Sequence, residues 1–336
     1  MSIRDAIGNT ILELARKDPS IVVLTADLAE SLKVGQFKQE LPKRFFDAGV
    51  AEQNMAGVAA GLALNDKVPF ILSFAVFNPG LNLAMIRTIA YSNLNVKIVG
   101  GHAGLSNAGD GATHQALEDI ASMRTLPNMT VLSPADDIQA RWATEQAVKI
   151  NGPVYIRSTR LDTPTLKHTQ EFKLKQPELI PNDCHPKPPS KDKFISKSQQ
   201  SNIQEGNREG CDVTLFSTGP IINTAIQVAK TLNQQKITTR VVNLHTLKPI
   251  NINAINQLIT QTQKLVVSLE DHQVSGGLGG LLAEIISGLD QPHPPLLRLG
   301  VKDQFGQSAR NTNKLYASYG LDETGVLQKI KEQLGS

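Results

Sequence analysis

The sequence predicts an α/β fold made of two domains with mostly parallel sheets. Short apolar segments that suit strands alternate with longer segments that suit helices, a pattern typical of parallel sheets covered by helices on both faces. One long polar stretch interrupts this alternation. The chain has 336 residues, which fits about two domains of roughly 150 residues each.

The first series of segments predicts a domain over residues 1–164. Its strand segments are continuously apolar, as expected for strands buried on both faces. The segment 52–64 is small and apolar almost all round, which predicts a buried helix. Strands are predicted at 21–27, 44–49, 69–74, 96–102, 129–135 and 154–158, and helices at 52–64, 78–93, 114–125 and 136–150.

The pattern fails over residues 165–211, and a second series follows it. Residues 181–210 are rich in Pro, Ser, Lys, Asn and Gln, so they carry too little apolar surface to offset the entropy lost on ordering. We expect 165–211 to be a polar linker between two domains. The second domain is predicted over 212–336, with strands at 212–219, 238–247, 264–271 and 296–302, helices near residues 225, 255 and 281, and a C-terminal helix.

The composition favours a soluble cytoplasmic protein. Hydrophobic residues make up 40% of the chain and charged residues 19%, which is ordinary for a globular protein. The longest nearly unbroken apolar run, 68–77, is shorter than the twenty or so residues that span a bilayer, and charges stand where a signal peptide would be apolar. A net charge of +3 and two cysteines do not favour nucleic-acid binding or a metal site.

Chemically active side chains gather where the predicted strands of the first domain end. In open parallel sheets the binding crevice lies beyond the carboxyl ends of the strands. The pattern therefore predicts a small-molecule site at this edge of the sheet. The candidates are Asp27, Glu52, Phe74, Phe77, His102, Asp110, His114, Arg157 and Arg160.

Several candidates also have an ordinary structural explanation. Phe74 and Phe77 suit a hydrophobic core, and His114 suits the start of a helix that binds no ligand. Arg157 suits a surface salt bridge as well as a phosphate site. The residues alone leave these alternatives open.

Glu52 is the most specific single candidate. It stands at the N-terminus of a helix that has no other charge before Asp66. An acid at a helix N-terminus is common, because the helix dipole favours it there. The helix dipole does not explain why the helix has no other charge. An otherwise uncharged helix indicates a buried environment, in which this carboxylate faces the interior and can share a proton with a ring nitrogen of a ligand.

Long motifs in the chain resemble the C-terminal half of transketolases. They read "DAGVAEQNMAGVAAGLAL", "SFAVF" and "GDGATHQALEDIASMRTLPNMTV", and the resemblance runs from about residue 4 to residue 160. It resumes at residue 212 through "VVNLHTLKPI", "GGLGG" and "GVKDQFG". The resemblance implies a pyrimidine-binding domain that serves thiamine diphosphate, followed by a transketolase C-terminal-like domain.

The resemblance implies cofactor-binding roles for four residues. Glu52 matches the glutamate that binds the aminopyrimidine ring of thiamine diphosphate and favours its imino tautomer, which then deprotonates the thiazolium carbon. Phe74 and Phe77 match aromatic residues of the pyrimidine pocket, with Phe77 stacking on the ring. Asp27 matches an acid at the cofactor end of its strand.

It also implies a substrate site for sugar phosphates. His102 and His114 match histidines that bind the sugar and assist proton transfers, and Asp110 matches an aspartate that contacts a donor hydroxyl. Arg160 matches the arginine that holds the substrate phosphate. Further phosphate contacts are implied for Arg4 and Ser31. In the second domain, where the family keeps no chemistry, we assign no role to His245 and His272.

The triplet Gly109-Asp110-Gly111 resembles the start of the diphosphate-binding motif of thiamine diphosphate enzymes. Its context differs, because polar "GLSNA" precedes it instead of an apolar strand, and no asparagine follows at 136–139, where the motif would have one. We therefore expect Asp110 to face the substrate. The resemblance then implies an N-terminal transketolase subunit as partner, which holds the diphosphate through Mg²⁺, in an α2β2 assembly.

The sequence is compatible with three functions. The leading one is a transketolase subunit that moves a two-carbon ketol unit between sugar phosphates. A β subunit of a 2-oxo acid dehydrogenase is the second, but it gives no reason for the set His102, Asp110, His114 and Arg160. A scaffold protein without catalysis is the third, and the presence of Glu52 argues against it.

Overall fold

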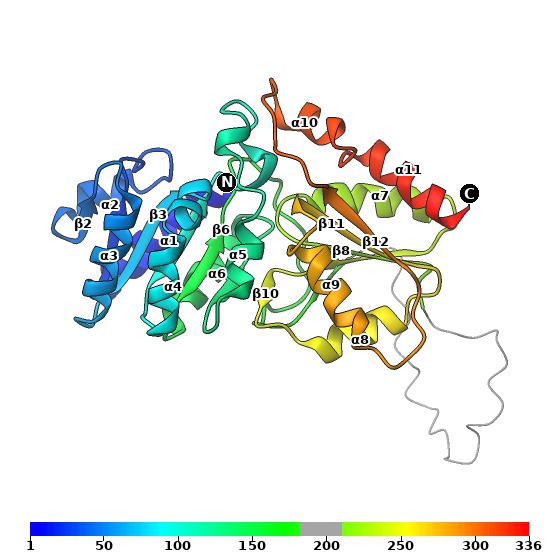
Figure 1. The fold of residues 1–336 in the computed structure, drawn as a ribbon, viewed down its shortest axis with the longest axis horizontal. Helices are drawn as coiled ribbons and strands as arrows, with labels where there is room; N and C mark the ends of the chain where they lie inside the picture. Colours follow the sequence, from blue (N-terminus) through cyan, green and yellow to red (C-terminus); the bar gives the residue numbers. More distant parts are fainter. Residues whose placement is uncertain (182–209, 336) are drawn as a thin grey trace, which may run out of the picture.

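The computed structural model describes residues 1–181 and 210–335 and confirms the α/β class, with two mostly parallel sheets. Figure 1 shows the two sheets with their helices as neighbouring units, the first coloured blue to green and the second mainly yellow to red. Within the described ranges, no helix is long and apolar enough to cross a membrane.

The first sheet has seven strands, and six of them run parallel. Its order is β10 (Thr246–Lys248), β5 (Thr130–Leu132), β6 (Val154–Arg157), β4 (Lys97–Gly101), β3 (Val68–Phe74), β1 (Ile21–Thr25) and β2 (Phe45–Asp47). Alternate residues of β3 serve the two faces: Ile71 joins one buried cluster, and Phe70 and Leu72 join another.

Helices cover both faces of the first sheet. Ile7 and Ala143, from the two helices α1 and α6, pack on the side of Phe70, while Met55 and Ile86, from α3 and α4, pack on the side of Ile71. The helices and turns of this unit are α1 (Ile3–Lys17), α2 (Gly35–Glu40), η1 (Pro42–Arg44), α3 (Glu52–Ala63), the π-helical η2 (Val76–Leu81), α4 (Leu83–Tyr91), η3 (Gly104–Ser106), η4 (Ala112–His114), α5 (Asp119–Thr125) and α6 (Asp137–Lys149).

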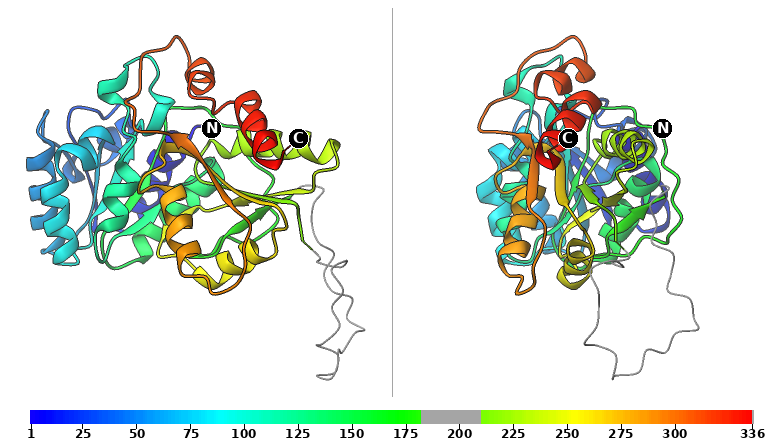
Figure 2. Two further views of the ribbon diagram at one scale, coloured as in Figure 1. Left: turned by 45° about the vertical axis from the view of Figure 1, so that its right-hand side comes forward. Right: turned by 90° about the vertical axis from the view of Figure 1, so that its right-hand side faces the viewer.

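The second sheet has five strands with helices on both faces. Its order is β12 (Leu296–Val301), β11 (Leu265–Gln273), β8 (Val213–Ser217), β9 (Thr239–Asn243) and β7 (Glu178–Ile180), of which only β7 runs antiparallel to its neighbour. The helices of this unit are α7 (Ile222–Gln234), α8 (Ile252–Thr260), α9 (Leu278–Ser287), α10 (Thr312–Ser318) and α11 (Glu323–Leu334). Figure 2 shows α7 and α11 on one side of the sheet and α8 and α9 toward the other.

Three predicted helices differ from the structure. The helix predicted at 78–93 is a π-helical turn around Pro79 followed by α4, because Asn78 has a non-helical backbone and proline removes a donor. The helix predicted at 114–125 begins only at Asp119. The helix at 52–64 is not fully buried, since Val58 is 43% exposed and Leu64 71% exposed.

The two units share more than a linker. The strand predicted at 238–247 is split into β9 and β10, and β10 pairs antiparallel with β5 of the first sheet. The amide of Ser133 also donates to the carbonyl of His245 at 2.9 Å. A division at 164 and 212 therefore stays a proposal, since one strand of the second series completes the first sheet.

The beginning of the expected linker contacts both units. His168 lies between the carboxylates of Asp136 at the start of α6 (Nε2–Oδ2 2.7 Å) and Glu178 on β7 (Nδ1–Oε1 2.6 Å). Residues 165–181 are thus held by ion pairs and a strand, which the interpretation as a polar tether did not foresee. The remainder of that interpretation concerns residues 182–209, which lie outside the described residues.

We expect His168 to make stability depend on pH in the alkaline range. Burial favours the neutral ring, but the hydrogen bonds to Asp136 and Glu178 outweigh burial and raise the pKa of His168 to about 9. In the unfolded chain the pKa is about 6.5. The stabilisation is therefore complete below about pH 6.5 and is lost as the pH rises through about 9.

Denaturant unfolding at pH 6, 7.5 and 9.5 checks this expectation. The wild-type free energy of unfolding should fall across this series by roughly 1–3 kcal/mol, and His168→Gln should flatten the fall. His293 is exposed and serves as the matched control, so His293→Gln should keep the wild-type slope. An unchanged slope in His168→Gln would show that the alkaline loss has another origin.

Candidate functional site

Glu52 lies at the first turn of α3, beside the end of β3. It is 4% exposed, and the hydroxyl of Ser73 donates to its Oε1 at 3.0 Å. The N-cap residue of α3, Ala51, makes no side-chain cap hydrogen bond. The described partner of the Glu52 carboxylate is therefore a side chain of the neighbouring strand rather than an amide of its own helix, so helix capping does not account for this acid.

Two aromatic rings and two histidines form a cluster at the end of β3, the strand whose Ser73 contacts Glu52. Phe74 ends β3 and Phe77 lies in the π-helical turn, and their rings are nearly parallel, with centroids 6.3 Å apart and an interplanar angle of 15°. The ring of His102 follows β4 and lies 4.0 Å from that of Phe74. The ring of His114 meets Phe77 edge-on at 5.6 Å. Both phenylalanines are only partly buried, and Phe74 also packs against the buried cluster of β3 and α1.

His102 has a ring nitrogen without a protein partner. The side chain is 3% exposed, and its Nδ1 has no hydrogen-bond partner among the described residues. Burial, reinforced by the positive charges of Arg4 and Arg160, lowers the pKa of His102 to about 3. The ring is therefore neutral near pH 7, and its free nitrogen can donate a hydrogen bond to a ligand or accept one from it, depending on the tautomer. A buried polar atom without a partner is costly, which makes this a place where a ligand group fits.

Arg160 lies at the open side of this cluster and connects it to the remaining candidates. Its Nη1 donates to Asn107 at 3.1 Å and lies 3.6 Å from the carboxylate of Asp110. Arg4 donates to the carbonyls of Ser31 (2.9 Å) and Arg160 (3.4 Å). Because the guanidinium of Arg160 is about half exposed, it can hold an anionic group from solution.

Asp27 is the candidate that the described contacts do not join to the others. It follows β1 with φ of +58°, and its amide donates to the carboxylate of Asp47 at 2.9 Å. No hydrogen bond or ion pair of its side chain is found among the described residues. It lies on the same edge of the sheet, so its role at the cofactor stays a prediction.

Arg157 does not belong to the open site. It is 2% exposed, and its Nε binds Asp119 at 2.9 Å, while its Nη2 donates to the carbonyl of Asp271 in the second unit at 2.8 Å. The alternatives of a surface salt bridge and a phosphate contact are both wrong, because the guanidinium is closed in between the two units. The packing that buries it was not visible in the sequence.

Sequence reasoning missed two residues of the site. Ser73 is the hydrogen-bond partner of Glu52, and Asn107 is a partner of Arg160. A signal for Ser73 was present, since it is a lone hydroxyl in the apolar run 68–77. Asn107 could not be distinguished from other polar residues of its loop.

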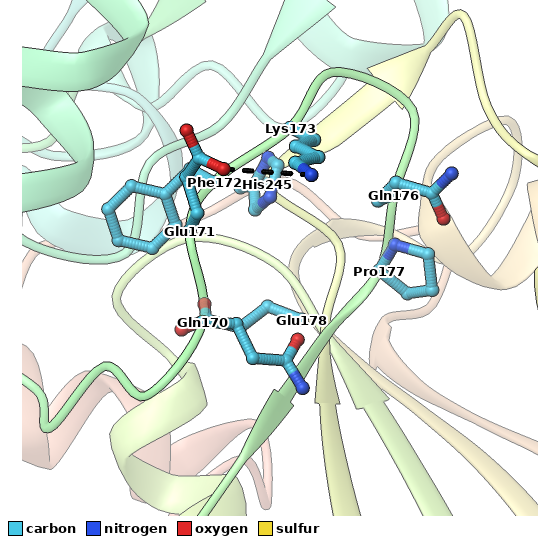
Figure 3. A pocket seen from close by; sticks show the side chains of 8 residues that line it. All are labelled: Gln170, Glu171, Phe172, Lys173, Gln176, Pro177, Glu178 and His245. Carbon is cyan, nitrogen blue, oxygen red and sulfur yellow. Dashed lines mark ion pairs between the residues drawn. The ribbon is translucent and has the colours of Figure 1, made fainter.

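One surface cavity lies beside the site, and another lies away from it. A cavity of about 310 Å³ borders Arg160 and includes Ser106 and Arg310. A second cavity of about 310 Å³ lies between segment 170–178 and His245, as Figure 3 shows, and shares no residue with the site. Burial lowers the pKa of His245 to about 4, so its ring is neutral near pH 7. We still assign no role to this residue.

Comparison with known proteins places this architecture in a family. Residues 1–165 match the model "Transketolase, pyrimidine binding domain", and residues 204–326 match "Transketolase, C-terminal domain". The chain is 36% identical to a protein of Methanocaldococcus jannaschii described as a transketolase C-terminal section, with 99% of this chain and 96% of that protein covered.

Two further similarities concern subunits of split enzymes. The chain is 36% identical to a 6-deoxy-6-sulfo-D-fructose transketolase subunit of a Clostridium species, with 98% of this chain and 94% of that protein covered. A solved structure titled as a split gene transketolase, an inactive beta4 tetramer, superposes with a TM-score of 0.82 at 37% identity and covers 100% of this chain and 99% of that one. The chain therefore belongs to the transketolase family, as a subunit of the split type.

Proposed function

We propose that the chain is one subunit of a two-chain transketolase that transfers a two-carbon ketol unit between sugar phosphates. The observation that carries the proposal is the buried Glu52 on Ser73 of β3, together with the stacked Phe74 and Phe77 that follow Ser73 along the chain. The ring of His102 lies against Phe74, is neutral, and has an Nδ1 without a partner among the described residues. These groups fit the pyrimidine half of thiamine diphosphate, which the family implies. The carboxylate of Glu52 suits a hydrogen bond to a ring nitrogen, and the flat rings of Phe74 and Phe77 suit stacking on an aromatic ring.

The residues of this chain have separable tasks in the proposed reaction. When bound, thiamine diphosphate supplies a carbon nucleophile that attacks the ketone carbon of the donor. Glu52 holds a proton at a ring nitrogen of the cofactor, while Phe74 and Phe77 fix the ring plane and exclude water. His102 and His114 move protons at the sugar oxygens, and Asp110 contacts a donor hydroxyl. Arg160, with Arg4 and Ser31 beside it, binds the terminal phosphate.

The anionic end of the proposed substrate contacts Arg160. A guanidinium fork binds phosphate and sulfonate oxygens in the same way, so Arg160 alone does not select between them. One relative is named as a 6-deoxy-6-sulfo-D-fructose transketolase subunit, so a sulfonate is the competing anionic group. We propose phosphate esters here, and a donor with a 6-sulfonate is the competitor to test.

The exposed apolar surface supports a partner subunit. Val58 of α3 and Leu64 at its C-cap are exposed, and the neighbouring η2 and α4 expose Leu81, Leu83 and Tyr91. Exposed large apolar side chains on neighbouring helices are a feature of interfaces. We propose that this surface receives a second copy of the chain and the N-terminal transketolase subunit, which carries the diphosphate and Mg²⁺, in an α2β2 assembly in the cytoplasm.

Mixing experiments test the proposal. The purified chain alone should bind thiamine diphosphate weakly and show no ketol transfer, and activity with xylulose 5-phosphate and erythrose 4-phosphate should appear when the N-terminal subunit of a split transketolase and Mg²⁺ are added. Robust turnover by the chain alone would contradict the split site. Decarboxylation of a 2-oxo acid by the mixture, without ketol transfer, would favour a dehydrogenase β subunit instead.

A further inference from the structure

The loop 102–115, which carries most of the substrate candidates, is held by the second unit. The amide of Ala309 donates to the carbonyl of Ala108 at 2.9 Å, and Gln115 donates to the carbonyl of Gln307 at 3.1 Å. Figure 1 shows the orange segment before α10 rising beside this teal loop. The C-terminal unit therefore shapes the loop although it contributes no candidate site residue.

One carboxylate of the second unit reaches the first turn of this loop. Asp271 on β11 is 3% exposed, and its Oδ1 accepts the amide of Leu105 at 2.8 Å. Its Oδ2 accepts the hydroxyl of Tyr316 at 3.0 Å. Gly104 has φ of +69°, and a Cβ added there would overlap Oδ2 of Asp271. The loop can approach the carboxylate this closely only because residue 104 is a glycine.

The turn held by Asp271 leads directly to the site. His102 lies three residues before Leu105, and the amide of Arg160 donates to the hydroxyl of Ser106, which in turn donates to the carbonyl of Ala103. A shift of this turn would therefore displace the ring of His102 on one side and the backbone of Arg160 on the other. Rigid support of this kind decides how precisely site residues are placed.

We propose that Asp271 is a positioning residue, whose carboxylate fixes the turn 104–106 and thereby sets His102 and Arg160 in the substrate site. This inference rests on the proposed function. It gives the C-terminal unit a defined task in the reaction, since Asp271 acts through the loop and does not touch the substrate.

A purely structural role of Asp271 can be separated from this one. The contact that joins Arg157 to Asp271 uses the main-chain carbonyl, so it persists when the side chain is removed. Asp271→Ala therefore removes the loop contact and the carboxylate charge near Arg157, but it keeps this hydrogen bond to the guanidinium. In Asp271→Asn, the amide oxygen can still accept from Leu105 and the amide group can donate to the oxygen of Tyr316, so this variant should retain the loop.

The protonation of His102 reports the position of the loop without any activity measurement. Its low pKa reflects burial together with Arg4 and Arg160, against Asp110, so a loosened loop that admits water should raise it. Ring signals of the seven histidines can be followed by NMR from pH 5 to 8, with His102 assigned by its loss in His102→Gln. In the wild type His102 should stay neutral throughout this range. In Asp271→Ala it should titrate within this range, which means that its pKa rises by at least about two units.

Two further variants serve as controls, one for misfolding of Asp271→Ala and one for the general effect of replacing a buried acid. Gly104→Ala pushes the turn away from Asp271 while both partners of the second unit stay intact, and it should raise the pKa of His102 in the same way. Glu270→Gln is the matched control, because Glu270 is equally buried but binds the amides of Leu278 and Gly279. Glutamine can accept only one of these two amides, so Glu270→Gln disturbs the start of α9 and not the loop 102–115, and it should leave His102 unchanged.

The outcomes are distinguishable. If His102 stays neutral in folded Asp271→Ala and in Gly104→Ala, the positioning role is wrong. If both variants shift His102 while Asp271→Asn keeps the wild-type behaviour, the role stands, and kcat/KM of the assembled enzyme should fall at least tenfold in Asp271→Ala and stay near wild type in Asp271→Asn. If the assembled wild type shows no ketol transfer, the proposed function fails while the shift of His102 still establishes that Asp271 holds the loop.

Discussion

Replacing Glu52 by glutamine is expected to lower kcat of the assembled enzyme about 10²–10⁴-fold, the range found when a positioned acid or base is removed. The amide oxygen of glutamine can still accept the hydroxyl of Ser73, so the local structure should be kept. What is lost is the ability to hold a proton at the cofactor ring. Steady-state kinetics with saturating thiamine diphosphate measures the loss, and Glu52→Ala should show a comparable one.

A second acid of the same unit provides the control for Glu52. Asp137 also stands in the first turn of a helix, but it accepts the hydroxyl of Thr165 and lies 3.9 Å from the amino group of Met1, and no described hydrogen bond or ion pair joins it to a candidate site residue. Asp137→Asn should keep kcat within about twofold, since a surface substitution of this kind changes little. Full activity of both Glu52 variants, with the assembly intact, would refute the assignment of a proton to Glu52.

Replacing Arg157 by leucine is expected to lower the free energy of unfolding by about 3–5 kcal/mol, because it leaves the carboxylate of Asp119 buried without its ion-pair partner. Asp119 is 1% exposed, accepts from Tyr155 at 2.7 Å, and its Oδ1 has no hydrogen-bond partner among the described residues. Urea or guanidinium unfolding followed by circular dichroism measures the loss.

The pH dependence of this loss identifies its cause. In the wild type, burial opposes ionisation of Asp119, but Arg157 and His272 outweigh it and lower the pKa of Asp119. Without Arg157, burial should raise that pKa above the unfolded value of about 3.9. The deficit of Arg157→Leu should therefore be largest above that raised pKa and shrink as the pH falls below it, because a protonated carboxyl is less costly to bury.

An exposed ion pair serves as the control for Arg157. Arg141 contacts Glu13 at 2.6 Å and Glu145 at 3.1 Å, and its side chain is about half exposed. Arg141→Ala should cost at most about 1 kcal/mol, as is usual for surface pairs. The double variant Asp119→Asn with Arg157→Leu should recover part of the loss. A deficit in Arg157→Leu no larger than in Arg141→Ala would show that Asp119 is stabilised by other groups.

Local pattern was enough to predict most of the strands, though not β7 or the division of 238–247, and several strand ends carry the candidate site residues. Continuous apolar runs such as 68–74 form buried parallel strands because only such residues can be covered on both faces. Since the carboxyl ends of parallel strands meet at one edge, Phe74 and His102 come together from different parts of the chain. Glu52 was identifiable because a lone charge on an apolar helix has few explanations.

Contacts between distant segments decided what the pattern left open. The helix predicted from residue 114 starts at Asp119, since the backbone of Gln115 is extended and its side chain donates to the carbonyl of Gln307 in the second unit. The segment 238–247 is divided between two sheets, since its second half pairs with β5. The periodicity of apolar residues depends on neighbours along the chain, so it cannot predict contacts with segments that are distant in the sequence.

The sequence by itself determined the class of fold, the family and most residues at the strand ends, because each depends on residue order and spacing. Only the tertiary structure decided that Arg157 is buried against Asp119, that Val58 and Leu64 are exposed, and that Asp271 holds the turn before the site. An apolar helix face or an arginine looks the same in the sequence whether it meets solvent or another segment. Burial and charge pairing are properties of the assembled chain, and they are set by which surfaces meet.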